Sequence, residues 1–125
     1  MHSDGLQRIV GPGGWIKFSG PTGNCVEVCQ QGRWVLIRDS AQLWLQPLSL
    51  KLGVWTDLRT HLRDNGLVPA KFGDLQLLVS GGCMTLKVQG HAITFSAGDS
   101  DAFVKGIQAG AFDQLEVDFS SLATA

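Results

Sequence analysis

Hydrophobic and polar residues alternate over short stretches of this chain, and each stretch is closed by a turn-forming residue. The alternation over Cys25–Cys29 predicts a strand, and a Gln-Gly turn leads into a returning strand over Trp34–Arg38. A third strand lies within Trp44–Leu50, where Pro47 favours an edge or a bulge. These segments predict an antiparallel meander.

The period then changes to that of a helix over residues 53–65. Trp55, Leu58 and Leu62 fall at helical spacing and form one apolar face. The pair Asn65-Gly66 supplies a left-handed stop. The first part of the chain therefore reads as three strands followed by one helix.

The second part repeats this order. Strands are predicted over residues 75–79, 83–88 and 91–95, and Ser96 with Asp99 has the form of a helix-capping box. Phe103 and Ile107 form the buried face of the helix, which Gly110 ends. The predicted fold class is α+β, with two small βββα lobes packed as an intramolecular pseudo-dimer.

The two lobes show a degenerate internal repeat. Five apolar positions recur at a separation of 45 residues: Leu48, Leu50, Leu58, Leu62 and Leu67 match Ile93, Phe95, Phe103, Ile107 and Phe112. Upstream, a separation of 50 aligns Val28 with Leu78, Gly32 with Gly82 and Leu36 with Leu86. A competing alignment keeps a single domain and treats residues 41–92 as an insertion.

Four segments follow from the repeat. Residues 1–14 are expected to form a flexible N-terminal segment, 15–67 the first lobe, 68–115 the second lobe and 116–125 a C-terminal tail.

Composition favours a globular protein of the reducing cytoplasm. Three cysteines do not form a disulfide framework, and no signal-peptide segment follows Met1. Residues 1–70 carry seven basic and five acidic side chains, whereas residues 71–125 carry three basic and six acidic ones. The overall charge of −1 gives no general electrostatic footprint for nucleic acid.

The sequence predicts no catalytic, metal or cofactor site. If they share a strand, Cys25 and Cys29 lie roughly 13 Å apart, which is too far for both to bind one zinc ion. No nucleophile elbow, phosphate-binding loop or dinucleotide fingerprint occurs in the sequence. We therefore expect a protein that is not an enzyme.

Several motifs resemble a family of small actinobacterial proteins, the BldB-like family. The first lobe has Asn24-Cys25-Val26-Glu27-Val28 and Arg38-Asp39-Ser40, followed by Leu48-Ser49-Leu50 and Trp55. The second lobe has Ile93-Thr94-Phe95-Ser96 and the run from Phe103 to Asp113. The resemblance spans residues 15–113, with the hairpin signature kept in the first lobe and the helix signature in the second.

This resemblance implies a non-enzymatic protein-binding module. Members of the family are typically encoded beside helix-turn-helix regulators of the WhiJ type and are thought to bind or antagonise them. The expected partner is such a regulator, without direct contact to nucleic acid or membrane and with possible self-association. The alternatives are a self-assembling structural protein and a small-molecule-binding enzyme with a site between the lobes.

The candidate partner-binding residues lie near the first hairpin: Trp34, Arg38, Asp39, Leu43, Trp44 and Leu45. Alternation along a strand would place Trp44 opposite Leu43 and Leu45, so that one face enters the core and the other meets a second surface. That surface is either the other lobe or a partner protein. Arg38 either contacts a partner or is a solvated edge charge, and Asp39 and Ser40 can close the hairpin as a local turn.

Overall fold

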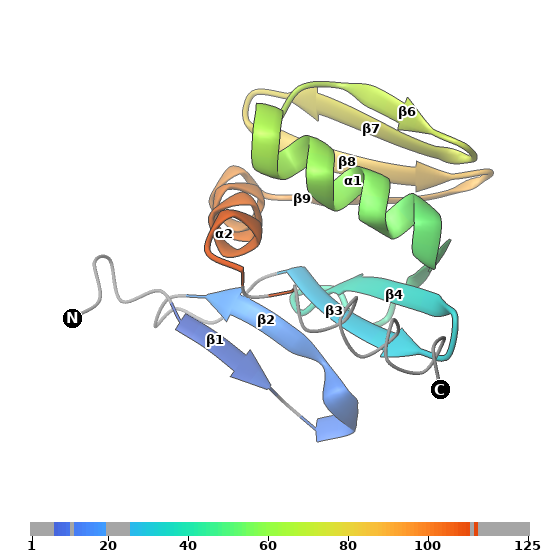
Figure 1. Cartoon of the computed structure of the whole chain (residues 1–125), viewed down its shortest axis with the longest axis vertical. Coiled ribbons are helices and arrows are strands. Elements are labelled where there is room, and N and C mark those ends of the chain that lie inside the picture. The colour runs from blue at the N-terminus through green and yellow to red at the C-terminus, as the bar shows by residue number, and fades with distance from the viewer. Residues whose placement is uncertain (1–6, 11, 20–25, 111, 113–125) are drawn as a thin grey trace.

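Each of the two helices lies between two antiparallel sheets and contacts both of them (Figure 1). The computed structural model describes residues 7–10, 12–19, 26–110 and 112. The expected α+β class is confirmed for this part of the chain. Among the described residues, no helix is long and apolar enough to cross a membrane.

The first sheet has five strands in sequence order. They are β1 (Gln7–Val10), β2 (Ile16–Ser19), β3 (Val26–Gln31), β4 (Trp34–Asp39) and β5 (Leu48–Lys51). The short 3-10 helix η2 (Pro12–Gly14) separates β1 from β2. Part of the N-terminal segment expected over residues 1–14 lies outside the described residues; its described part forms β1 and η2, and β1 pairs with β2 in an antiparallel register.

The second sheet has four strands, again in sequence order. They are β6 (Ala70–Phe72), β7 (Leu75–Ser80), β8 (Cys83–Val88) and β9 (His91–Phe95). Both predicted helices are present, as α1 (Leu52–Asn65) and α2 (Ala97–Gln108). The predicted cap of α2 is confirmed because the Ser96 hydroxyl accepts a hydrogen bond from the Asp99 amide at 3.1 Å.

The strand pairing shows that corresponding strands in the two halves pair in the same register. Val28 pairs with Ile37 in the first half, and Leu77 pairs with Leu86 in the second. The upstream separation is therefore 49 residues, and the predicted value of 50 is wrong by one. The slip matters because neighbouring strand residues face opposite sides: Leu77 is fully buried, whereas Leu78 is 42% exposed. Ile37 pairs with Leu48, and its counterpart Leu86 pairs with Ile93, so Leu48 and Ile93 occupy corresponding positions. The predicted downstream separation of 45 residues is therefore confirmed.

The expectation of three strands in each half is also wrong. Each half has an additional short strand before its hairpin, β2 in the first and β6 in the second. Ile16 pairs with Val28 and Ala70 pairs with Leu77, so Ile16-Lys17-Phe18 corresponds to Ala70-Lys71-Phe72. Segments this short give too little alternation to stand out from the turns around them. The first sheet has β1 in addition.

The hydrophobic core runs through both halves. The predicted helix faces are confirmed, since Trp55, Leu58, Leu62, Phe103 and Ile107 are all at most 1% exposed. The rings of Trp55 and Phe103 lie 6.3 Å apart between centroids and join the two helices. Contacts also cross between halves, because α1 packs against β6 and α2 against β2. Neither half can bury its helix without the other.

Candidate functional site

The loop of residues 40–47 joins β4 to β5 and carries two of the most exposed large apolar side chains among the described residues. Leu43 is 58% exposed and Trp44 is 77% exposed. The corresponding connection in the second half, from β8 to β9, is only the two-residue turn Gln89-Gly90. The loop is thus an extension that one half has and the other lacks.

Asp39 holds the start of this loop. Its carboxylate accepts hydrogen bonds from the Ala41 amide at 2.9 Å and from the Gln42 side chain at 2.8 Å, and the residue is only 4% exposed. The Gln42 amide donates to the Asp39 carbonyl at 2.9 Å. These hydrogen bonds form a local turn that begins at Asp39. Asp39 therefore has the turn-closing role that the sequence analysis gave as one alternative.

The second half holds the rest of the loop. The Gln42 side chain donates to the Thr94 carbonyl of β9 at 3.4 Å, and a ring nitrogen of His91 bonds the Gln46 carbonyl. Leu45 is partly buried and packs against the core. The loop therefore has an ordered base and an apolar tip formed by Leu43 and Trp44.

The structure does not bring the six candidate partner-binding residues into one patch. Arg38 bonds Glu27 at 2.7 Å, and its guanidinium carbon lies 3.9 Å from the ring centroid of Trp15. Asp39 is buried. Trp34 is exposed but stands at the opposite end of β4, five residues from Asp39, or roughly 16 Å along the strand.

The alternation expected for Leu43-Trp44-Leu45 is wrong. The segment forms turns and not a strand, so side chains do not alternate between two faces. Leu43 and Trp44 are both exposed, whereas Leu45 turns toward the core. Of the six residues, only Leu43 and Trp44 form an exposed apolar tip.

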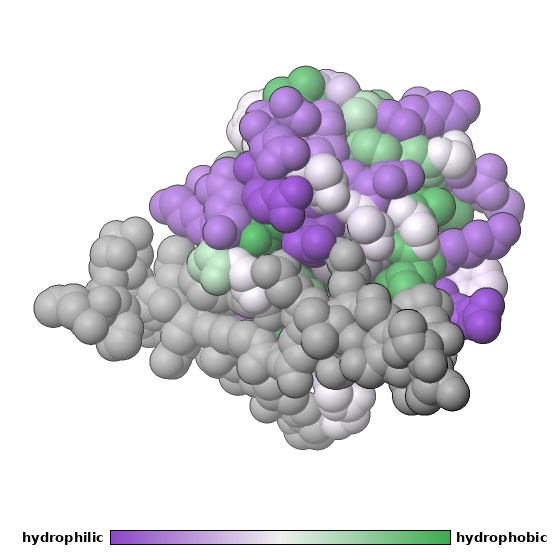
Figure 2. Space-filling model, viewed as in Figure 1, coloured by the Kyte–Doolittle hydropathy of each residue, from purple (hydrophilic) through white to green (hydrophobic). Residues whose placement is uncertain are grey.

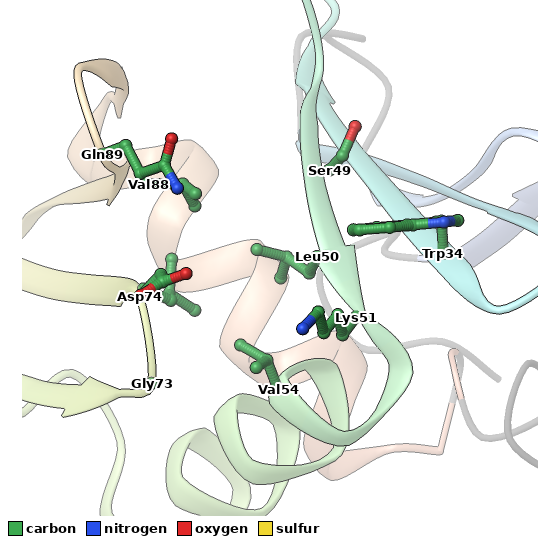
Figure 3. Close-up of a pocket in the computed structure, with 10 residues that line it drawn as sticks. Trp34, Ser49, Leu50, Lys51, Val54, Gly73, Asp74, Val88 and Gln89 are labelled. Atoms are coloured by element: carbon green, nitrogen blue, oxygen red, sulfur yellow. The ribbon is translucent and has the colours of Figure 1, made fainter.

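A cavity of about 500 Å³ lies where the two halves meet beside β5 (Figure 3). Leu50, Lys51 and Val54 extend from the first half toward Asp74 and Gln89 of the second, as Figure 3 shows. None of these residues was predicted from the sequence to belong to a site, although Leu50 is part of the internal repeat. They come from a strand, a helix and two turns that are far apart along the chain, so no local motif joins them.

Two titratable groups in the described part of the chain have shifted pKa values. Burial raises the pKa of the Cys29 thiol, against the effects of the Gln31 side chain and the Arg38 charge. Burial also raises the pKa of Asp99; the hydrogen bond with Ser96 lowers it, and the nearby Asp39 charge raises it further. No group of three or more His, Cys, Asp or Glu side chains that could hold a metal ion occurs among the described residues.

The comparisons with known proteins place this chain in no group. No family model, no curated protein and no solved structure matches it.

Proposed function

We propose that this protein is a non-enzymatic binding module that modulates a helix-turn-helix transcription regulator in the cytoplasm of an actinobacterium. The loop of residues 40–47 is its principal contact. The observation that carries the proposal is the 77% exposure of Trp44 at the tip of an otherwise anchored loop. Tryptophan is enriched among the residues that dominate protein–protein binding energy.

The loop meets two physical requirements for a binding surface. Burying Leu43 and Trp44 against a partner would remove apolar surface from water, at about 25 cal/mol per Å². The bonds to Asp39 and to Thr94 hold the loop base before binding, which reduces the entropy lost on association. A surface already in its bound conformation binds more tightly than a flexible one.

The resemblance to the BldB-like family supplies the class of partner. Its hairpin motif Arg38-Asp39-Ser40 leads directly into this loop, and Asp39 shapes the loop. In this proposal the two halves form a pseudo-dimer in which one chain replaces two associating copies. Joining them raises their effective concentration for each other and removes the need for self-association.

Affinity capture from the native host tests the proposal. The wild-type protein is expected to retain a regulator with a helix-turn-helix domain, identified by mass spectrometry. A bait with Leu43→Ala and Trp44→Ala is expected to retain at least about tenfold less, since two apolar anchors contribute more than 1.4 kcal/mol.

A matched control separates the loop from general surface hydrophobicity. Leu78 is exposed to 42% on the second sheet, so Leu78→Ala removes the same atoms as Leu43→Ala at another exposed site. The Leu78→Ala bait is expected to retain the regulator like wild type. Equal loss of the regulator from the Leu43→Ala bait and the Leu78→Ala bait would contradict the proposal. A wild-type bait that retains no helix-turn-helix protein would also contradict it.

A further inference from the structure

Three hollows that share lining residues adjoin at the junction of the two halves. The central cavity shares Trp34 and Lys51 with a hollow of about 570 Å³ at the start of α1. It shares Gly73, Asp74 and Gln89 with a hollow of about 280 Å³ on the second sheet. We call these three adjoining hollows together the basic groove, because of the charges described next.

Four basic side chains and one acidic one line the basic groove. Arg33 and Lys51 lie at its first-half end, Lys71 and Lys87 at its second-half end, and Asp74 between them. No ion pair with Lys51, Lys71 or Lys87 is found among the described residues. Without counting Arg33, the three lysines and Asp74 give the groove a local charge of +2, in a chain whose net charge is −1.

The groove also includes the outer edge of β5, which pairs with no further strand among the described residues. β5 is the last strand of its sheet, and the Leu52 amide bonds the Arg33 carbonyl across from it. Because hydrogen-bonded pairs alternate along an antiparallel ladder, the backbone groups of Leu50 face β4 and those of Ser49 face outward. Ser49 and Lys51 both line the central cavity.

The rest of the central cavity is largely apolar. Leu50 and Leu75 are buried at its base, Val54 and Val88 are partly buried, and the half-exposed indole of Trp34 stands across β5 from them (Figure 3). Figure 2 shows hydrophilic residues over much of the described surface, with apolar residues between them. The groove therefore combines positive ends with an apolar middle.

We propose that the basic groove binds an acidic, extended peptide segment of a partner protein, which adds to the outer edge of β5. Backbone hydrogen bonds to Ser49 would fix the strand, its apolar side chains would enter the central cavity, and its carboxylates would face the lysines. The outer edge of β5 and the apolar cavity favour a peptide over a nucleic acid, whose recognition relies on phosphate contacts and stacked bases. No residue of the loop 40–47 lines the groove, so this site does not depend on the function proposed for that loop.

Fluorescence anisotropy with a labelled peptide of about ten residues tests the proposal, a length that spans roughly 33 Å when extended. The probe alternates glutamate and leucine. We expect it to bind the full chain, and we expect a peptide that alternates lysine and leucine to bind at least about tenfold more weakly. A probe with N-methylated alternate backbone amides keeps the charges but loses hydrogen bonds, and it should also bind more weakly.

Paired variants locate the binding. Lys51→Gln with Lys87→Gln should weaken binding of the acidic probe by about tenfold, as two charged contacts are lost. Arg63→Gln with Lys105→Gln removes the same charge from exposed positions that do not line the groove, and it should change affinity by less than about twofold. Circular dichroism confirms that each variant is folded.

Four results would overturn the proposal. The first is that the acidic probe does not bind, and the second is that the basic probe binds as tightly as the acidic one. The third is that the two double variants weaken binding of the acidic probe equally. The fourth is that a single-stranded oligonucleotide of equal charge binds more tightly than the acidic probe. Equal binding of the N-methylated probe would remove the strand-addition mode. Backbone amide shifts in NMR should centre on Ser49 and Lys51, and shifts confined to residues 40–47 would assign the probe to the other surface.

Discussion

At the scale of single residues, Gln89 is the one described non-glycine residue with a positive φ, at 55°. It occupies the two-residue turn between β8 and β9, where glycine or asparagine would adopt this conformation at lower cost. The same residue lines the basic groove. Backbone strain and a surface cavity therefore coincide at one position.

Replacing Gln89 with glycine should raise the free energy of unfolding by about 0.5 kcal/mol. Relief of strain of about 1 kcal/mol is partly offset by the greater entropy of glycine in the unfolded chain. Gln76→Gly is the matched control, because Gln76 is exposed on β7 without a positive φ. That change should lower the free energy of unfolding by about 0.5–1 kcal/mol. Urea unfolding measures both, and equal losses would contradict the strain at Gln89.

The raised pKa of Asp99 predicts a dependence of stability on pH. Burial is the main cause, and the charge of Asp39 adds to it. Between the ordinary carboxyl range, near pH 4, and the raised value, the folded state holds a proton that the unfolded chain has lost. Stability from this group is therefore lost as the pH rises through that window.

Asp99→Asn removes this dependence. The unfolding free energy of the variant minus that of wild type should increase as the pH rises from the ordinary carboxyl range through the raised pKa, by less than about 1 kcal/mol because the group is partly exposed to solvent. Urea unfolding at several pH values measures the difference. A difference that stays constant or falls over this range would contradict the assignment.

At the scale of elements, periodicity predicted the two hairpins and both helices, since each has a sustained apolar face. It missed β2 and β6, which pair over only a few residues. The alignment slipped by one residue at the second hairpin, where Gly81 and Gly82 both offer a match to Gly32. Because the slip reverses the side of every strand residue, only the pairing register could resolve it.

The candidate site was predictable only in part. Leu43 and Trp44 stood out as large apolar residues, but strand alternation predicted opposite faces for them. Their shared exposure depends on the turns that Asp39 and Gln42 form. The basic groove gave no local signal, because Lys51 lines one hollow, Lys71 and Lys87 line another, and only tertiary packing makes the hollows adjoin. Lysines of a chain with balanced charge can thus gather on one surface without any basic run in the sequence.

The cap of α2 provides a test at this scale. Ser96→Ala removes the acceptor of the Asp99 amide and should lower the free energy of unfolding by about 1 kcal/mol. Ser49→Ala alters an exposed serine on β5 that caps no helix, and it should change stability by less than about 0.5 kcal/mol. Thermal or urea unfolding distinguishes the two, and equal effects would show that the cap contributes nothing specific.

At the scale of the whole molecule, the two halves exchange helix contacts and share one aromatic cluster. Trp55 of α1 lies beside Phe103 of α2 and beside Phe112, with ring centroids 6.3 and 6.2 Å apart. Each helix contacts both sheets. The halves are therefore expected to fold together, although their strands form two separate sheets.

This coupling predicts a single cooperative unfolding transition. All four tryptophans lie before residue 68, so their fluorescence reports the first half and the cluster that Trp55 shares with the second, whereas a label on Cys83 reports the second half alone. The two signals should give the same urea midpoint and the same slope. Two separate midpoints would show that the halves unfold independently and that the shared core does not couple them.

The central claim is that the loop of residues 40–47 binds a helix-turn-helix regulator. Size-exclusion chromatography with light scattering, on the protein alone and mixed with the regulator captured from the host, tests it most directly. We predict a 13.4 kDa monomer that forms a stoichiometric complex, and no complex for the variant with Leu43→Ala and Trp44→Ala. A stable oligomer of the protein alone that ignores the regulator would contradict the claim and would assign the exposed loop to self-assembly.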